Sequence, residues 1–240
     1  MRHSLRLHIF ALLVMAAFLP AATQKTTAQT REEFELHLVL AFDVSASIND
    51  SEFALQRNGT ANALRHSSVR NAISEARGGI AISIVQWSSI QQQVLAMDWV
   101  ALKNDDDVIK FADAVGNMPR ILPGGGTMVH AGLEFSERQF DAAPGVARRH
   151  VIDLSGNGRS DDFEQMLATR ERLVGRGIVI NGLAIEEDYD DLSDYFSASL
   201  IGGAGAFVVT ANGHEDFGDA MQIKLFREIN GAVYAKLFPQ

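Results

Sequence analysis

The stretch that decides the fold of this chain is Leu36-His37-Leu38-Val39-Leu40-Ala41-Phe42-Asp43-Val44-Ser45-Ala46-Ser47. Its first seven residues are almost all apolar. This pattern predicts a strand covered on both faces of a parallel sheet, since such strands lack a polar side. Asp43, Ser45 and Ser47 follow at alternating positions. They would lie at the carboxyl end of the strand, where open α/β sheets bind their ligands.

Two interpretations of this polar end are open. One carboxylate with two hydroxyls is an oxygen-only ligand set, which suits Mg²⁺ or Mn²⁺ better than zinc. Alternatively, Asp43 and the two serines belong to a turn that caps the next helix. The rest of the chain has to distinguish the two.

The order of the remaining elements predicts an α/β fold. Apolar or β-branched runs predict further strands at 80–87, 91–99, 149–155, 178–185 and 206–209. Between them, helical periodicity predicts helices over 52–76, from 105 to at least 115, and over 128–140, 163–176, 192–201 and 217–233. The link between 87 and 91 is too short for a parallel crossover, so 91–99 is expected to be an antiparallel edge strand. The prediction is a doubly wound, mostly parallel six-stranded sheet with helices on both faces.

The N-terminus has the layout of a secretory signal peptide. A basic start, Met1–Arg6, precedes an apolar run from Ile9 to Leu19 and then small and polar residues. That layout predicts a signal over residues 1–28, a linker over 29–34 and export to the periplasm or the medium. An uncleaved anchor is the weaker alternative because the run is short for a membrane span. No later run is apolar enough to insert into a membrane after cleavage.

Composition excludes several partners and chemistries. The 240-residue chain has a net charge of −9, and the predicted signal carries basic but no acidic residues. This acidic balance argues against nucleic acid and anionic membranes as partners. The absence of cysteine excludes disulfides, thiolate metal sites and cysteine catalysis.

A glycine-rich loop precedes the predicted helix at 128–140. Gly124, Gly125 and Gly126 let the backbone approach a neighbour closely, and Thr127 follows them. No lysine precedes Thr127, so this is not a phosphate-binding loop of the Gly-Lys-Thr kind. A hydroxyl at the mouth of this loop is a candidate metal ligand.

Together these motifs resemble the von Willebrand factor type A (VWA) domain, in a bacterial-type secreted subgroup. The resemblance covers about residues 35–238, and the VWA-like domain is expected to occupy 35–240. It implies a metal-ion-dependent adhesion site (MIDAS), in which Asp43, Ser45, Ser47 and Thr127 hold Mg²⁺ directly or through water. It also implies a protein partner that supplies an acidic residue to the metal.

The third loop, after the strand at 149–155, departs from the family pattern. The family has an Asp followed by Gly there, whereas this chain has Asn157 followed by Gly158. An Asn carbonyl can still be a ligand, but the site loses one negative charge, so weaker intrinsic metal affinity is expected. Asp153, within the strand, is expected either to be a buried partner of a nearby arginine or of loop amides, or to lie behind the metal ligands. Asp161 and Asp162 are expected to cap the following helix.

Other classes of function remain as alternatives. A strand ending in Asp also opens haloacid dehalogenase-like phosphatases, but these need a second Asp where this chain has Ser45. There is no Gly-x-Ser-x-Gly motif, and His66, His130, His150 and His214 show no metal-binding spacing. The interpretation adopted is an exported, non-enzymatic module that binds Mg²⁺ or Mn²⁺ and through it a protein. A metal-free VWA-like scaffold and a metal-dependent hydrolase are the alternatives.

Overall fold

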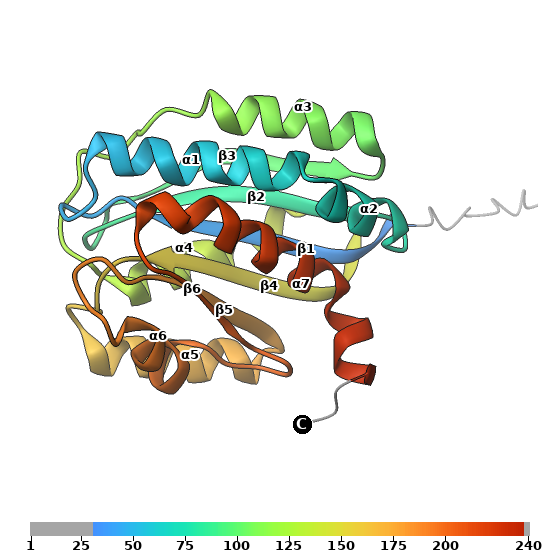
Figure 1. The fold of residues 1–240 in the computed structure, drawn as a ribbon. Coiled ribbons are helices and arrows are strands. Elements are labelled where there is room, and N and C mark those ends of the chain that lie inside the picture. Colours follow the sequence, from blue (N-terminus) through green and yellow to red (C-terminus); the bar gives the residue numbers. More distant parts are fainter. Residues whose placement is uncertain (1–30, 238–240) are drawn as a thin grey trace, which may run out of the picture. The chain divides into compact units, whose positions relative to one another are not determined.

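The computed structural model describes residues 31–237, with side chains through Gly231. Six strands form one sheet in the order β3-β2-β1-β4-β5-β6 (Figure 1). Their bounds are Glu33–Asp43 (β1), Ile80–Trp87 (β2), Gln93–Leu102 (β3), Val146–Gly156 (β4), Ile178–Ile185 (β5) and Val208–Ala211 (β6). All neighbouring strands are parallel except β2 and β3, which are antiparallel. The predicted sheet, including its antiparallel edge strand, is confirmed.

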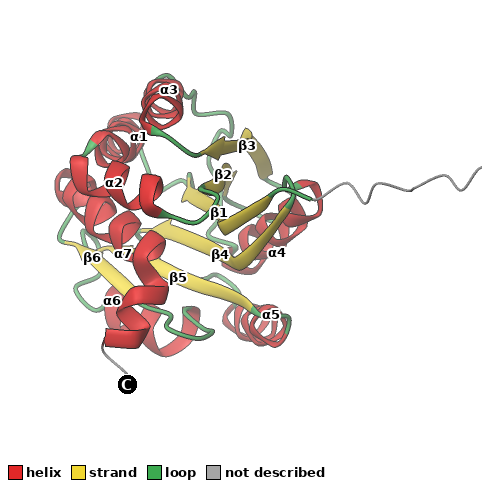
Figure 2. Ribbon diagram, turned by 90° about the vertical axis from the view of Figure 1, so that its right-hand side faces the viewer, coloured by secondary structure: helices red, strands yellow, loops and turns green. Residues whose placement is uncertain are grey.

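Helices cover both faces of the sheet (Figure 2). The helices are Asp50–Arg65 (α1), Ser67–Glu75 (α2), Asp105–Gly116 (α3), Val129–Gln139 (α4), Phe163–Gly175 (α5), Leu192–Tyr195 (α6) and Phe217–Leu237 (α7). Side chains of α1, α2, α3 and α7 share one core cluster with the sheet. Side chains of α4, α5 and α6 share the cluster on the other face.

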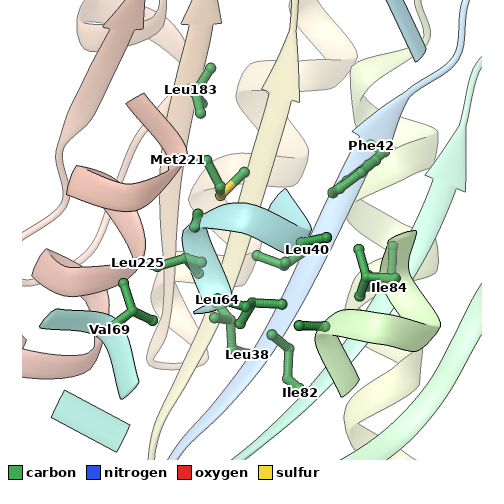
Figure 3. Close-up of a cluster of buried hydrophobic side chains, with 14 of the residues drawn as sticks. Leu38, Leu40, Phe42, Leu64, Val69, Ile82, Ile84, Leu183, Met221 and Leu225 are labelled. Atoms are coloured by element: carbon green, nitrogen blue, oxygen red, sulfur yellow. The ribbon is translucent and has the colours of Figure 1, made fainter. Parts of the chain in front are cut away.

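Strand β1 is buried on both faces, as its apolar run predicts. Leu36, Leu38, Leu40 and Phe42 belong to the cluster beneath α1 and α7, whereas Ala41 belongs to the opposite cluster. Figure 3 shows Leu38, Leu40 and Phe42 gathered with side chains from α1 and α7. Because β1 is also paired with β2 and β4, its carboxyl end has little freedom.

The helix predicted over 52–76 is two helices. His66 has an extended backbone (φ −65°, ψ 138°) and separates α1 from α2. Its Nδ1 accepts from the backbone N–H of Ser68, so the imidazole caps α2. The apolar periodicity continues across this break, since Leu64, Val69 and Ile73 are all buried. The apolar periodicity of the sequence therefore could not indicate the break at His66.

Helices α1 and α7 pack with their backbones in close approach (Figure 1). A Cβ added at Gly59 of α1 would lie 2.9 Å from the Cα of Gly218 in α7. Real Cβ atoms essentially never come so near another heavy atom, so this crossing requires glycine at position 59.

The predicted signal over residues 1–28 lies outside the described residues. Across residues 31–237, every helix is too short or too polar to span a bilayer.

A group of buried ionic side chains joins α7 to the sheet. The Nζ of Lys224 lies 3.1 Å from Oδ1 of Asp153 in β4 and 3.4 Å from Oε1 of Glu228. Asn181 of β5 donates to the same Glu228 oxygen at 2.7 Å. All four side chains are at most 2% exposed. The expectation of a buried ionic partner for Asp153 is therefore met by a lysine rather than by an arginine or loop amides.

This buried group makes folding stability depend on pH. Burial raises the pKa of Asp153 from 3.8 to about 7, although the positive charge of Lys224 opposes the rise. A carboxyl whose pKa is raised on folding binds its proton more tightly in the folded state, so it stabilises the fold in acid and loses that contribution as pH rises towards 7. The free energy of unfolding should therefore fall by about 2 kcal/mol from this residue between pH 5 and pH 7.

Urea unfolding of wild type and Asp153→Asn across this pH range tests the effect. The Asn variant should show a flatter pH dependence, because its amide does not titrate. Parallel pH profiles for the two proteins would contradict the assignment.

Candidate metal centre

The loops that follow β1 and β4 meet because these strands are neighbours in the sheet. Their pairing extends to Phe42 and Ser155, one residue before the end of each strand. The hydroxyl of Ser47 donates to Oδ1 of Asn157 at 2.8 Å, and the hydroxyls of Ser45 and Ser47 are hydrogen-bonded at 3.1 Å. Three of the predicted ligands are thus in one chain of hydrogen bonds.

Asp43 lies at the base of this cluster and is fully buried. Its Oδ1 accepts from the backbone N–H of Ser45 at 2.7 Å, whereas Oδ2 has no hydrogen-bond partner among the described residues. A Cβ added at Gly156 would lie 3.0 Å from this Oδ2, so glycine there leaves room beside the carboxylate. Burial raises the pKa of Asp43 to about 6, opposed by the hydrogen bonds from Ser45 and the charge of Arg120.

The glycine-rich loop, residues 124–126, is hydrogen-bonded to the loop after β1. The backbone N–H of Ala46 donates to the carbonyl of Gly125 at 2.8 Å. A Cβ added at Gly125 would lie 2.3 Å from the hydroxyl oxygen of Ser89 and 2.4 Å from Oε1 of Gln92, so a larger residue would displace these side chains. The first residue before α4 is Met128, and the helix has no side-chain cap. The Thr127 hydroxyl is therefore not used to cap the helix, and it makes no hydrogen bond to a described residue.

Thr127 faces the loop after β4. A Cβ added at Gly158 would lie 3.9 Å from the hydroxyl oxygen of Thr127. Helix α4, which begins two residues later, packs closely against the sheet. A Cβ added at Gly132 would lie only 2.8 Å from the ring of Trp87, so the helix backbone is in contact with this ring. That ring is fully buried, and its N–H donates to the carbonyl of Ala41 at 3.2 Å.

Asp161 is part of the site, although the sequence interpretation treated it as a helix cap. Its Oδ2 accepts from the backbone N–H of Thr127 at 2.7 Å, and its own N–H donates to the Thr127 carbonyl at 2.9 Å. Its negative charge also contributes to the raised pKa of Asp43. The neighbouring Asp162 does cap α5, because it accepts from the N–H of Gln165 at 3.0 Å. Only one residue can occupy the cap position of α5. The presence of two adjacent aspartates therefore already indicated that one of them, Asp161, has another role.

Arg120 was also missed by the sequence interpretation. Its guanidinium donates to the carbonyl of Val44 at 3.1 Å and pairs with Asp50 at 3.1 Å. It thus links the segment before the glycine loop to the loop after β1. Its charge lowers the pKa of Asp43, the opposite effect to that of Asp161.

Asp153 lies apart from this cluster. Its carboxylate is turned to Lys224 in the buried ionic group described above. The structure therefore gathers Asp43, Ser45, Ser47, Thr127 and Asn157 at one edge of the sheet, adds Asp161, and places Asp153 with α7.

The gathered residues fit a small hard cation. They offer carboxylate, hydroxyl and amide oxygens and no nitrogen or sulfur ligand, which is the set that Mg²⁺ and Mn²⁺ prefer. Asp43 supplies a buried carboxylate oxygen without a partner, and a bound cation would satisfy it.

Solved structures place this fold in a class. Proximal thread matrix protein 1 from the mussel byssus matches with a TM-score of 0.61 and 16% identity, over 81% of this chain and 48% of that chain. A von Willebrand factor type A protein from Catenulispora acidiphila matches at 0.57 and 15%, over 82% and 43% of the two chains. The vWF domain of the pili tip protein Mfa5 from Porphyromonas gingivalis matches at 0.56 and 11%, over 83% and 96%.

The fold is therefore that of the VWA domain, as the sequence motifs indicated. Within this class, the model of the family described as protein of unknown function DUF1194 matches residues 33–233, and the chain belongs to that family. A comparison with curated proteins finds no sequence match. The chain spans about half the length of the mussel protein, which has also been solved with a zinc-occupied MIDAS motif.

Substitution of Asp43 tests whether its burial destabilises the metal-free fold. At pH 8 in chelator, the wild-type protein has to bury an ionised carboxylate whose pKa is about 6. Asp43→Asn removes that charge and should raise the free energy of unfolding by about 1–3 kcal/mol, as measured in urea. At pH 5 Asp43 is largely protonated in the fold, so the difference between the two proteins should shrink. A less stable Asn variant at pH 8 would show that the carboxylate stabilises the fold without an ion.

Proposed function

We propose that this protein is an exported binding module that holds Mg²⁺ or Mn²⁺ at Asp43, Ser45, Ser47, Thr127 and Asn157. Through the ion it binds an acidic residue of a protein partner. The observation that carries the proposal is the buried Oδ2 of Asp43, which has no partner among the described residues and lies where the other oxygen ligands gather.

The balance of charge supports an acidic partner. Asp43 and Asp161 are the two carboxylates at the site, and Asp161 is engaged with the backbone of Thr127. Asn157 is neutral where the VWA pattern has an aspartate. An ion bound mainly by Asp43 and neutral oxygens keeps part of its positive charge. Because Mg²⁺ takes six oxygen ligands and retains several waters, a carboxylate from another protein can replace one of them.

The surface around the site supports a protein rather than a small molecule as partner. Four large apolar side chains at this edge of the sheet are 41–61% exposed: Ile90, Ile121, Phe163 and Tyr189. They come from the segment between β2 and β3, the segment before the glycine loop, the start of α5 and the segment after β5. Apolar and aromatic side chains around a charged centre are typical of protein-binding surfaces.

The arrangement of the hydroxyls supports binding rather than catalysis. Ser45 and Ser47 are hydrogen-bonded to one another and to Asn157. Hydroxyls that are hydrogen-bonded in this way present their oxygens as ligands, so we propose binding rather than catalysis as the role of this site.

Export is part of the proposal. It rests on the basic and apolar N-terminal sequence, with residues 1–28 as the signal and a single VWA-like domain over 35–240. Byssus matrix and pilus tip proteins are among the structures of similar fold. A periplasmic or secreted location agrees with both.

A metal-free scaffold is the second candidate. The hydrogen bonds among Ser45, Ser47 and Asn157 satisfy these side chains without an ion. In that case the surface around the site would bind its partner directly, and neither Mg²⁺ nor Mn²⁺ would affect binding.

Affinity capture from the exported fraction distinguishes the two candidates. Wild type with Mg²⁺ should retain a partner that is lost in chelator, and Asp43→Asn should retain none under either condition. In parallel, Mg²⁺ or Mn²⁺ should raise the melting temperature of wild type but not that of the variant, as expected of a ligand that binds only the folded state. Equal capture in chelator, with no melting shift in wild type, would favour the scaffold.

Asn157→Asp should strengthen the metal site. The added carboxylate restores the missing charge, so the affinity for Mg²⁺ should rise about tenfold or more, which corresponds to about 1.4 kcal/mol. Calorimetric titration of both proteins measures the change. Wild type binding Mg²⁺ as tightly as the Asp variant would refute this role for position 157.

A further inference from the structure

A second cluster of metal-ligating side chains lies near the metal centre but shares no ligand with it. It borders a hollow of about 340 Å³ between the start of α1 and the segments after β5 and β6. Among the described residues, the hollow is lined by no lysine or arginine and by four carboxylates: Glu52, Glu187, Glu215 and Asp216. His214 also lines it.

His214 is the unusual member of this lining. Its side chain is 3% exposed, yet the Nε2 atom has no hydrogen-bond partner among the described residues. The other ring nitrogen, Nδ1, is hydrogen-bonded to Oε2 of Glu187. A buried polar atom without a partner is costly, so this imidazole is incompletely satisfied, and its Nδ1 is the nitrogen that faces a carboxylate of the hollow.

The cluster has the dimensions of a cation site. One nitrogen of His214 and one oxygen each of Glu52 and Glu187 lie within 4.8 Å of one another. Nitrogen and oxygen ligands lie about 2.0–2.2 Å from zinc, so two of them in a tetrahedral shell are about 3.3–3.6 Å apart. The three atoms would therefore have to move together by up to about 1.5 Å, which rotation of the partly exposed Glu187 side chain can supply.

Glu52 is already held in place. Its two carboxylate oxygens accept from the backbone N–H of Asn49 at 2.8 Å and from the Asn49 side-chain amide at 2.6 Å. The first of these bonds, together with the one from the Glu52 N–H to Oδ1 of Asn49, forms the capping box at the start of α1. A carboxylate has about four lone-pair sites, so Glu52 can bind an ion while it caps the helix.

We propose that Glu52, Glu187 and His214 form a site for Zn²⁺. An imidazole with two carboxylates is a mixed nitrogen and oxygen set, which suits zinc, whereas Mg²⁺ prefers oxygen ligands alone. The two carboxylates balance the charge of the ion, and a water would complete a four-coordinate shell. The proposal is independent of the function proposed for the Asp43 site.

Calorimetric titration with Zn²⁺ in saturating Mg²⁺ tests this site. The titrated protein carries Asp43→Asn, so that zinc cannot bind through Asp43. We expect about one Zn²⁺ bound per chain, and an affinity that falls at least tenfold when Glu187→Gln or His214→Gln is added. Glu215→Gln is the matched control, because Glu215 lines the same hollow outside the ligand set. It should change the affinity by less than about threefold.

Several outcomes would overturn the proposal. They are no Zn²⁺ binding by the starting protein, unchanged affinity in both ligand variants, or an equal loss in Glu215→Gln, which would indicate only a diffuse acidic surface. Circular dichroism checks the fold of each variant. If the His214 variant fails to fold because that side chain is buried, Glu187→Gln decides alone, since the Glu187 side chain is 47% exposed.

Discussion

Burial of β1 on both faces is the constraint on which the rest of this structure depends. Its side chains alternate between two separate cores, and its backbone pairs with β2 on one side and β4 on the other. A strand held in this way cannot slip by one residue without exchanging its two faces. Asp43 is therefore fixed at one position, at the carboxyl end of β1. The pairing of β1 with β4 also brings together the loops that follow these two strands.

Two buried carboxylates show two ways in which the fold accommodates charge. Asp153 is balanced by charge, since the Nζ of Lys224 lies 3.1 Å from its Oδ1, although neither carboxylate oxygen accepts a hydrogen bond from a described residue. Asp43 is equally buried but forms no ion pair with a described residue, and Arg120 and Asp161 act on its pKa in opposite directions. The first arrangement is typical of a structural ion pair. The second is typical of a site built for a ligand, because no cationic side chain in this part of the chain is in contact with the carboxylate.

Features that depend on local pattern could be predicted from the sequence. The apolar run of β1, the short link before β3 and the caps of α3 and α5, Asn104 and Asp162, each depend on residues close together in the chain. Features that depend on distant residues could not. Asp161 acts on Thr127 from 34 positions away, and Lys224 lies 71 positions after Asp153. His66 interrupts a helix through its own capping hydrogen bond, which the apolar periodicity does not reveal. His214 looked isolated in sequence because Glu52 and Glu187 lie on other elements, brought near it only by the order of the sheet.

The close approach of Gly59 and Gly218 has a mechanical consequence. Helix α1 begins just after the loop that carries Ser45 and Ser47, and α7 carries Lys224, which is paired with Asp153. At their crossing backbone meets backbone, so a displacement of α7 at this point has to move α1 as well, and with it the end of the loop after β1. A side chain introduced at Gly59 would push the helices apart and pull the buried lysine away from its carboxylate.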